Sequence, residues 1–242
     1  MCAPGYYKAN YRALSLRAVA RARGLFRLPL AYLVTRFMKP AATGWMPQMW
    51  ADLECQEQDL SERFFQATAL YREAFKHAGF SELGFKKVRR FLNPGYRDNG
   101  GINYLDGSRC HFGQLIYNRL HVPPPVSRDR EHIVIAFTAV FQTGTLSYTN
   151  KRKTFFEPMQ HHTVVRLPSN DVADIYRRFV GDLGHRDEQP RRFPDLRALQ
   201  DWFDSNATEM YERWVRQGLY VRMTDDEVAA ALRRLPPPLP NQ

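Results

Sequence analysis

The sequence predicts an α+β fold, in which an antiparallel meander sheet of four to five strands is covered by helices and preceded by a basic helical arm. Three observations lead to this prediction. Apolar residues recur at every second position of segment 133–141, which is typical of a half-buried strand. Asp106-Gly107 is a strong hairpin signal between two strand-like segments. Apolar residues at helical spacing precede and follow these strands, so helices are available to cover the sheet.

The first 46 residues are predicted to form a basic amphipathic arm and a linker. Residues 1–51 carry eight Lys and Arg side chains and no Asp or Glu, whereas the rest of the chain is close to neutral. Segment 11–24 has a helical pattern, and the short apolar run LPLAYLV follows at 28–34. That run is far below the ~20 apolar residues that a membrane-spanning helix needs. Pro40, Gly44 and Pro47 indicate the linker.

Residues 47–235 are predicted to form a single α+β domain, and residues 236–242 a proline-rich tail. Strands are expected between residues 83 and 150 and once more at 161–167. Apolar residues at helical spacing, preceded by capping residues in several cases, predict helices over 49–77, 172–183, 195–217 and 225–232.

The doublet Gly100-Gly101 is interpreted as a turn. The alternative is a nest of backbone N–H groups for an anion, because four basic residues are near in sequence: Lys86, Lys87, Arg89 and Arg90.

The hairpin AFTAVFQTGTLSYTN, residues 136–150, is expected to have one core face and one face rich in hydroxyl groups. A turn at Thr143-Gly144 gives the core face Phe137, Ala139, Phe141, Leu146 and Tyr148. The opposite face carries Thr138, Val140, Ser147 and Thr149. We expect it to be a polar face made of β-favouring residues. The alternative is a small-ligand site in which Thr138, Ser147 and Thr149 hydrogen-bond a polar molecule.

Histidines are candidates for the rim of that alternative site. If strands 132–141, 145–150 and 161–167 form a meander, then His132, His161 and His162 lie at the same end of the sheet, and His132 and His162 would border the ligand. The sequence contains no HExxH motif, Cys/His box, GxSxG elbow, P-loop or GxGxxG opening a helix. We therefore expect no metal and no cofactor, and we assign no catalytic residue.

The segment FTAVFQTGTLSYTN resembles a strand-turn-strand module, F-x-x-x-F-x-x-G-x-x-x-x-T-N, of poorly characterised bacterial proteins. The matching positions are Phe137, Phe141, Gly144, Thr149 and Asn150, and the likeness extends over about residues 80–185. The resemblance implies a fold and brings no established activity, cofactor or catalytic residue. Hydrophobic, membrane-associated sequence often precedes the module in that family, whereas this chain has only the short run LPLAYLV.

The predicted function is that of a non-enzymatic accessory or binding protein that docks through its arm on an anionic membrane surface or an acidic protein partner. Basic residues attract anionic lipids and aromatic residues anchor at the interface. The expected contact residues are Arg12, Arg17, Arg21, Arg23, Arg27, Tyr32 and Arg36. Three cysteines without metal-like spacing favour a reducing, cytoplasmic location, with peripheral membrane association. Two alternatives stay open: a small-ligand binder or enzyme that uses the hydroxyl face, and RNA binding through the arm.

Overall fold

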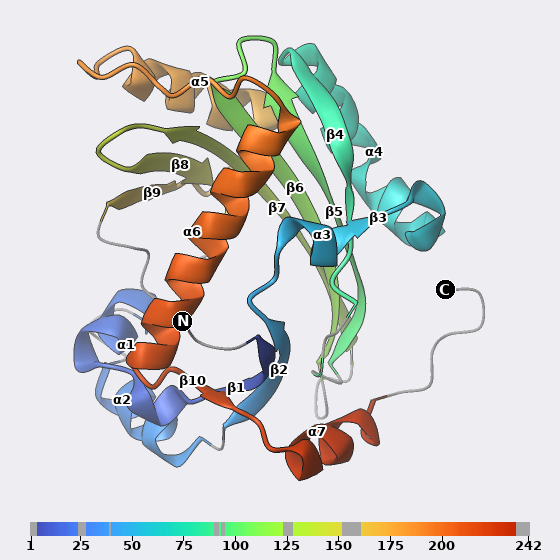
Figure 1. Ribbon diagram of the computed structural model, residues 1–242, viewed down its shortest axis with the longest axis vertical. Helices are drawn as coiled ribbons and strands as arrows, with labels where there is room; N and C mark the ends of the chain where they lie inside the picture. The colour runs from blue at the N-terminus through green and yellow to red at the C-terminus, as the bar shows by residue number, and fades with distance from the viewer. Residues whose placement is uncertain are drawn as a thin grey trace.

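Two sheets organise the computed structural model, which describes residues 4–23, 28–38, 40–89, 92, 95–122, 128–151 and 161–235 (Figure 1). The large sheet has seven strands in chain order: β3 (Glu54–Cys55), β4 (Phe80–Lys86), β5 (Tyr96–Asp106), β6 (His111–Val122), β7 (Arg128–Val140), β8 (Thr145–Thr149) and β9 (His162–Arg166). The small sheet has the order β10-β1-β2, with β1 (Gly5–Ala9), β2 (Ala41–Met46) and β10 (Tyr220–Arg222).

The helices are distributed before, between and after these strands. They are α1 (Leu16–Arg23), α2 (Leu28–Phe37), α3 (Trp50–Leu53), α4 (Glu62–His77), α5 (Val172–Leu183), α6 (Leu196–Arg216) and α7 (Asp225–Leu232), with the 3-10 turns η1 (Tyr11–Ala13) and η3 (Glu57–Asp59). The α+β class is therefore confirmed.

The predicted meander of four to five strands is wrong, because the large sheet has seven strands and is mixed. Strands β3 to β8 pair antiparallel with their neighbours. Strand β9, however, pairs with β8 in parallel, with Thr145 opposite His162 and Thr149 opposite Arg166. Two consecutive strands can pair in parallel only if a crossover connection brings the chain back from the end of the first strand to the level of its start. The apolar pattern inside a strand carries no information about this return.

The predicted core face of the central hairpin is confirmed. Phe137 is fully buried, and its ring contacts Phe75 of α4 and Phe179 of α5 at centroid distances of 5.0 and 6.1 Å. Helices α4 and α5 therefore cover this face of the large sheet. The other core-face residues of the hairpin belong to the same buried cluster: Ala139, Phe141, Leu146 and Tyr148.

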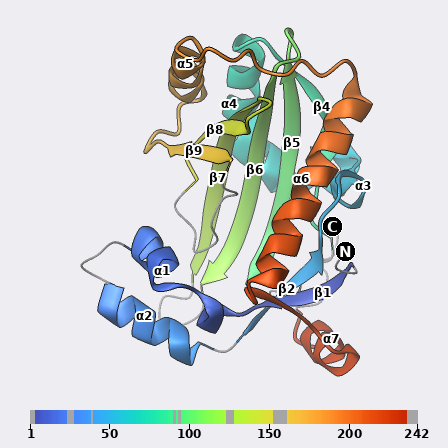
Figure 2. The same cartoon turned by 60° about the vertical axis from the view of Figure 1, so that its left-hand side comes forward.

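Helix α6 covers the opposite face and crosses it diagonally (Figures 1 and 2). It begins at an N-cap, Asp195, whose carboxylate accepts a hydrogen bond from Ala198 N at 2.8 Å. Leu199 of α6 packs with Phe112 and Val140 of the sheet, and Trp50 and Phe193 complete this second cluster. The large sheet is thus a middle layer between α4 and α5 on one face and α6 on the other.

The single helix expected over 49–77 is wrong. The chain instead forms α3, pairs β3 with β4 and starts α4 at a separate cap, because the Ser61 side chain accepts a hydrogen bond from Phe64 N at 3.0 Å. A serine cap satisfies a backbone donor that would otherwise remain unpaired at the helix start. Gly79 follows α4 with a φ of 84°, as its position after the helix predicts.

The expected linker contains a strand. Strand β2 pairs with β1, and β1 pairs with β10 on its other side, so both strands of the arm belong to one sheet with a strand from the C-terminal region. Below the large sheet, α1 and α2 lie beside this small sheet (Figure 2). The expected tail, 236–242, lies outside the described residues.

Candidate functional site

The hydroxyl groups of the central hairpin share one face of the sheet, as expected from the pairing of β7 with β8. They form hydrogen bonds with other groups of the protein. Thr138 and Ser147 are opposite each other, and their hydroxyl oxygens are 2.8 Å apart. The Thr149 hydroxyl donates to Ile135 O at 2.7 Å and accepts from Lys151 N at 3.0 Å. These three hydroxyls therefore have hydrogen-bond partners without a ligand.

The predicted common location of the three histidines is wrong. His132 is opposite Asn118 near the start of β7 and is exposed. His162 is opposite Thr145, which pairs with Val140 at the end of β7. Because β9 is parallel to β8 and therefore antiparallel to β7, His132 and His162 lie at opposite ends of the sheet.

His162 lines a hollow of about 410 Å³ between the β7–β8 turn and α6. Burial lowers its pKa, and the neighbouring His161 lowers it further. Thr145 Oγ1 is buried at the same place and has no hydrogen-bond partner among the residues that the structure describes. His161 Nε2 lies 4.0 Å from Glu209 Oε1. Within the described part of the chain, no three or more His, Cys, Asp or Glu side chains are grouped so that they could hold a metal ion.

A second polar region lies on the α6 face of the large sheet, around Lys86 at the end of β4. Its Nζ donates to Asn103 Oδ1 at 2.9 Å, and Gln114 Nε2 donates to the same oxygen at 3.2 Å. Burial lowers the pKa of Lys86 to about 7, with a further contribution from Lys151. These residues line or adjoin a cavity of about 230 Å³, whose apolar wall includes Phe203 of α6.

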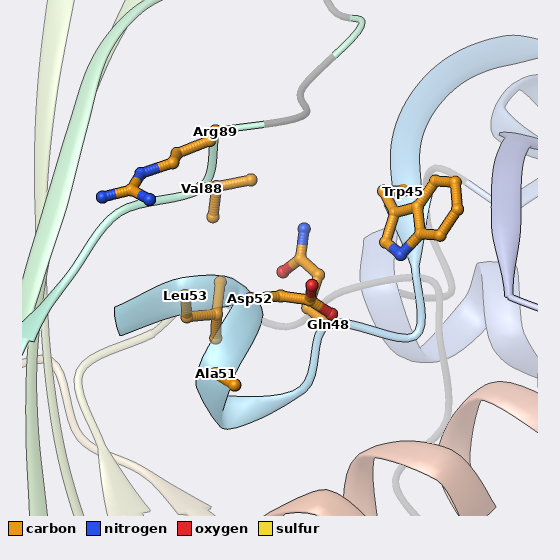
Figure 3. Close-up of a pocket in the computed structure, with 7 residues that line it drawn as sticks. All are labelled: Trp45, Gln48, Ala51, Asp52, Leu53, Val88 and Arg89. Atoms are coloured by element: carbon orange, nitrogen blue, oxygen red, sulfur yellow. The ribbon is translucent and has the colours of Figure 1, made fainter. Parts of the chain in front are cut away.

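A neighbouring pocket of about 150 Å³ opens beside that cavity (Figure 3). Trp45 lies on one side of it, Val88 and Arg89 lie on the other, and Gln48 and Asp52 lie between them (Figure 3). Gln48, Leu53 and Val88 line both spaces, so the pocket adjoins the Lys86 cavity. Arg89 is exposed here and donates to Asp59 Oδ2 at 2.8 Å.

The glycine doublet belongs to β5 and forms no turn. Gly100 pairs with Tyr117 and Gly101 with Ile116. A Cβ on Gly100 would lie 2.7 Å from the Phe64 ring, and a Cβ on Gly101 would lie 2.7 Å from Lys86 Cε. The doublet therefore allows close packing on both faces of the sheet, and Gly101 makes room for the Lys86 side chain.

A third feature is the surface of α2, which has apolar residues on two sides. Leu28, Ala31 and Tyr32 pack against the buried cluster of Leu14, Val19 and Leu219. The other side is exposed: the accessible fractions are 70% for Leu30, 56% for Leu33, 50% for Val34 and 75% for Phe37. These positions follow the i, i+3, i+4, i+7 spacing of one helix face. We call these four residues the apolar face of α2.

The predicted contact residues of the arm have different surroundings. Arg12 and Arg17 are exposed near this helix. The Tyr32 ring is partly buried, and the Arg36 guanidinium lies 4.4 Å from its centroid and donates to Arg12 O. Arg21 and Arg23 lie within α1, and Arg27 lies outside the described residues. Sequence reasoning noted the apolar run at 28–34 but did not identify the exposed side of α2, because that side depends on how α1 packs.

Comparison of the chain with protein-family models, curated proteins and solved structures gave no match. Function is therefore inferred from the chain's own residues and geometry. Among the described residues, no helix combines the length and the apolar character needed to cross a membrane.

Proposed function

We propose that the protein docks peripherally on anionic membrane surfaces through the apolar face of α2. The observation that carries this proposal is the exposure of Leu30, Leu33, Val34 and Phe37 on one side of a single helix. Contiguous apolar residues at a protein surface are typical of an interaction site. A surface-bound helix buries such a face among the lipid headgroups and the first acyl carbons without spanning the bilayer.

Charge around α2 favours an anionic surface over an uncharged one. The first 51 residues have no Asp or Glu, so no carboxylate of this segment opposes an approaching anionic lipid. Each basic residue near an anionic membrane contributes ~1 kcal/mol to binding. Arg12 and Arg17 are exposed and are available for this contact. A membrane uses both features together, whereas RNA would gain little from a Leu and Val face.

The hydroxyl face of the hairpin provides less support for a ligand site. Thr138 and Ser147 bond to each other, and Thr149 bonds to the backbone. A ligand that used these groups would have to replace existing hydrogen bonds, whose net contribution is typically ~1 kcal/mol each.

Co-sedimentation with vesicles tests the proposal on the full chain. We expect binding to phosphatidylcholine vesicles that contain phosphatidylserine and little binding to phosphatidylcholine alone. The double variant Leu33→Ser/Phe37→Ser should bind at least tenfold more weakly, because full burial of one such side chain contributes ~1.5–3 kcal/mol. Leu70→Ser is the matched control, since Leu70 is 84% exposed on α4, outside the proposed surface.

The electrostatic part is tested separately. Arg12→Gln and Arg17→Gln should each weaken binding about fivefold at low salt, in line with ~1 kcal/mol per charge. Equal binding to neutral vesicles, or unchanged binding of Leu33→Ser/Phe37→Ser, would contradict the proposal. Binding to single-stranded RNA that falls steeply with salt, without vesicle binding, would favour the RNA alternative instead.

A further inference from the structure

The cavity at Lys86 lies inside the molecule, is lined by polar side chains and is separate from the surface of α2. Lys86 is only 9% exposed, although an ammonium group is costly to bury without a partner. Its side chain extends over β5 at Gly101, the residue directly opposite it, where any larger residue would collide with Lys86 Cε. The fold therefore holds this amine in a defined interior position.

The partners of the amine leave room for a negatively charged group. A protonated lysine has three N–H donors. Within the described part of the chain, Nζ donates to one acceptor, Asn103 Oδ1, at 2.9 Å. The described residues that line the cavity include no Asp or Glu. Lys87, which also lines it, donates to Asp59 O at 2.6 Å, so this second amine is held by a backbone carbonyl.

The rest of the lining suits a short organic molecule with one polar end. Gln114 and Asn118 present amide groups on the sheet side, and Leu53, Ile116 and Phe203 form apolar walls. The volume of about 230 Å³ lies below the ~300–1,000 Å³ of pockets that hold drug-sized ligands, so the fitting molecule has few heavy atoms. The pocket in Figure 3 adjoins this cavity, and Asp52 and Arg89 are among the residues that line it.

We propose that this cavity binds a small organic carboxylate, with Lys86 Nζ as its counter-ion and the amides of Gln114 and Asn118 as further donors. The carboxylate would supply the acceptors that the ammonium lacks. Its short alkyl part would contact Leu53 and Phe203. Binding at this site would be an activity of the protein that is independent of membrane docking.

Isothermal titration calorimetry of the full chain with sodium butanoate at pH 6.5 tests this proposal. Butanamide is the control ligand, because it has nearly the same shape and no charge. We expect butanoate to bind and butanamide to bind at least tenfold more weakly, as expected when a hydrogen bond to a charged group is lost. Lys86→Met should weaken butanoate binding at least tenfold, and Gln114→Leu should weaken it less.

Two control variants separate this site from other effects. Lys76→Met removes an exposed lysine of α4 that pairs with Glu73 at 2.9 Å, and it should bind butanoate like the wild type. Leu33→Ser/Phe37→Ser should also bind butanoate normally, so failure of membrane docking and failure of the cavity proposal can be distinguished.

A measurement on the wild type covers the case in which Lys86→Met does not fold. In ¹³Cε-lysine NMR, butanoate should raise the titration midpoint of the lysine that titrates lowest, because a bound carboxylate favours the charged amine. Absence of butanoate binding, equal affinity for butanamide, or full affinity in folded Lys86→Met would overturn the proposal. An unchanged lysine midpoint at saturating butanoate would overturn it as well.

Discussion

Replacing Lys86 with Met should stabilise the protein most at acidic and neutral pH. Burial, with a contribution from Lys151, lowers the pKa of Lys86 from 10.5 to about 7. At a pH between these two pKa values, Lys86 is protonated in most unfolded molecules and deprotonated in most folded molecules. Wild-type stability from this group therefore rises as the pH rises from about 7, and the cost of burying the charged amine is fully present below that pH.

The size of this effect follows from the pKa difference. One pKa unit corresponds to about 1.4 kcal/mol, so the whole shift is on the order of 5 kcal/mol. Folded-state Lys86 is about half protonated at pH 7, so between pH 7 and pH 9 the part that can be measured is about 2 kcal/mol. Methionine has a similar length and no charge, so it should fill the space beside Gly101 without this pH dependence.

Urea unfolding followed by tryptophan fluorescence at pH 6, 7, 8 and 9 measures the predicted difference. The free energy of unfolding of Lys86→Met minus that of the wild type should be largest at pH 6 and should decrease by about 2 kcal/mol from pH 7 to pH 9. Lys76→Met, in which an exposed lysine is replaced, should show a difference that hardly changes with pH. A constant difference for Lys86→Met over this range would refute the assignment of a buried amine with a lowered pKa.

Two further predictions concern the large sheet. Phe137→Ala should lower the free energy of unfolding by about 3–5 kcal/mol, because the Phe137 ring is fully buried between α4 and α5; a loss below 1 kcal/mol in urea unfolding would contradict this core. Gly144→Ala should lower the Tm clearly, since Gly144 has a φ of 148° and an added Cβ would lie 2.0 Å from His161 O. For Gly107→Ala no atom of the described chain lies within 4 Å of the added Cβ, so the Tm should be nearly unchanged, and equal Tm values for the two variants would argue against the turn geometry.

Local sequence patterns were sufficient to predict those structural features that depend on a single strand, hairpin or helix. The two faces of the central hairpin follow from the alternation of side chains along β7 and β8, and Thr138 is indeed opposite Ser147. The separate start of α4 could also have been found, because Ser61 is a recognisable cap.

Features that depend on distant segments could not be predicted from these patterns. The direction of β9 is set by pairing with β8 across the sheet, and β2 is a strand because it pairs with β1. The burial of Lys86 depends on Gly101 in the neighbouring strand and on α6 above it. The glycine doublet beside a lysine pair is a usable signal of this packing, although within its local sequence the doublet indicates a turn or an anion nest.

The small sheet has a consequence for the order in which the protein can fold. Its central strand, β1, is held on one side by β10, and Lys8 in β1 pairs with Glu227, 219 positions later in the chain. Closing so long a loop is slow compared with forming local hairpins such as β5–β6. During synthesis, β1 can pair with β2 early, but its pairing with β10 must wait for nearly all of the described chain. Helix α2 lies between β1 and β2 in sequence, so its docking surface is expected to reach its final position only after the large sheet has been made.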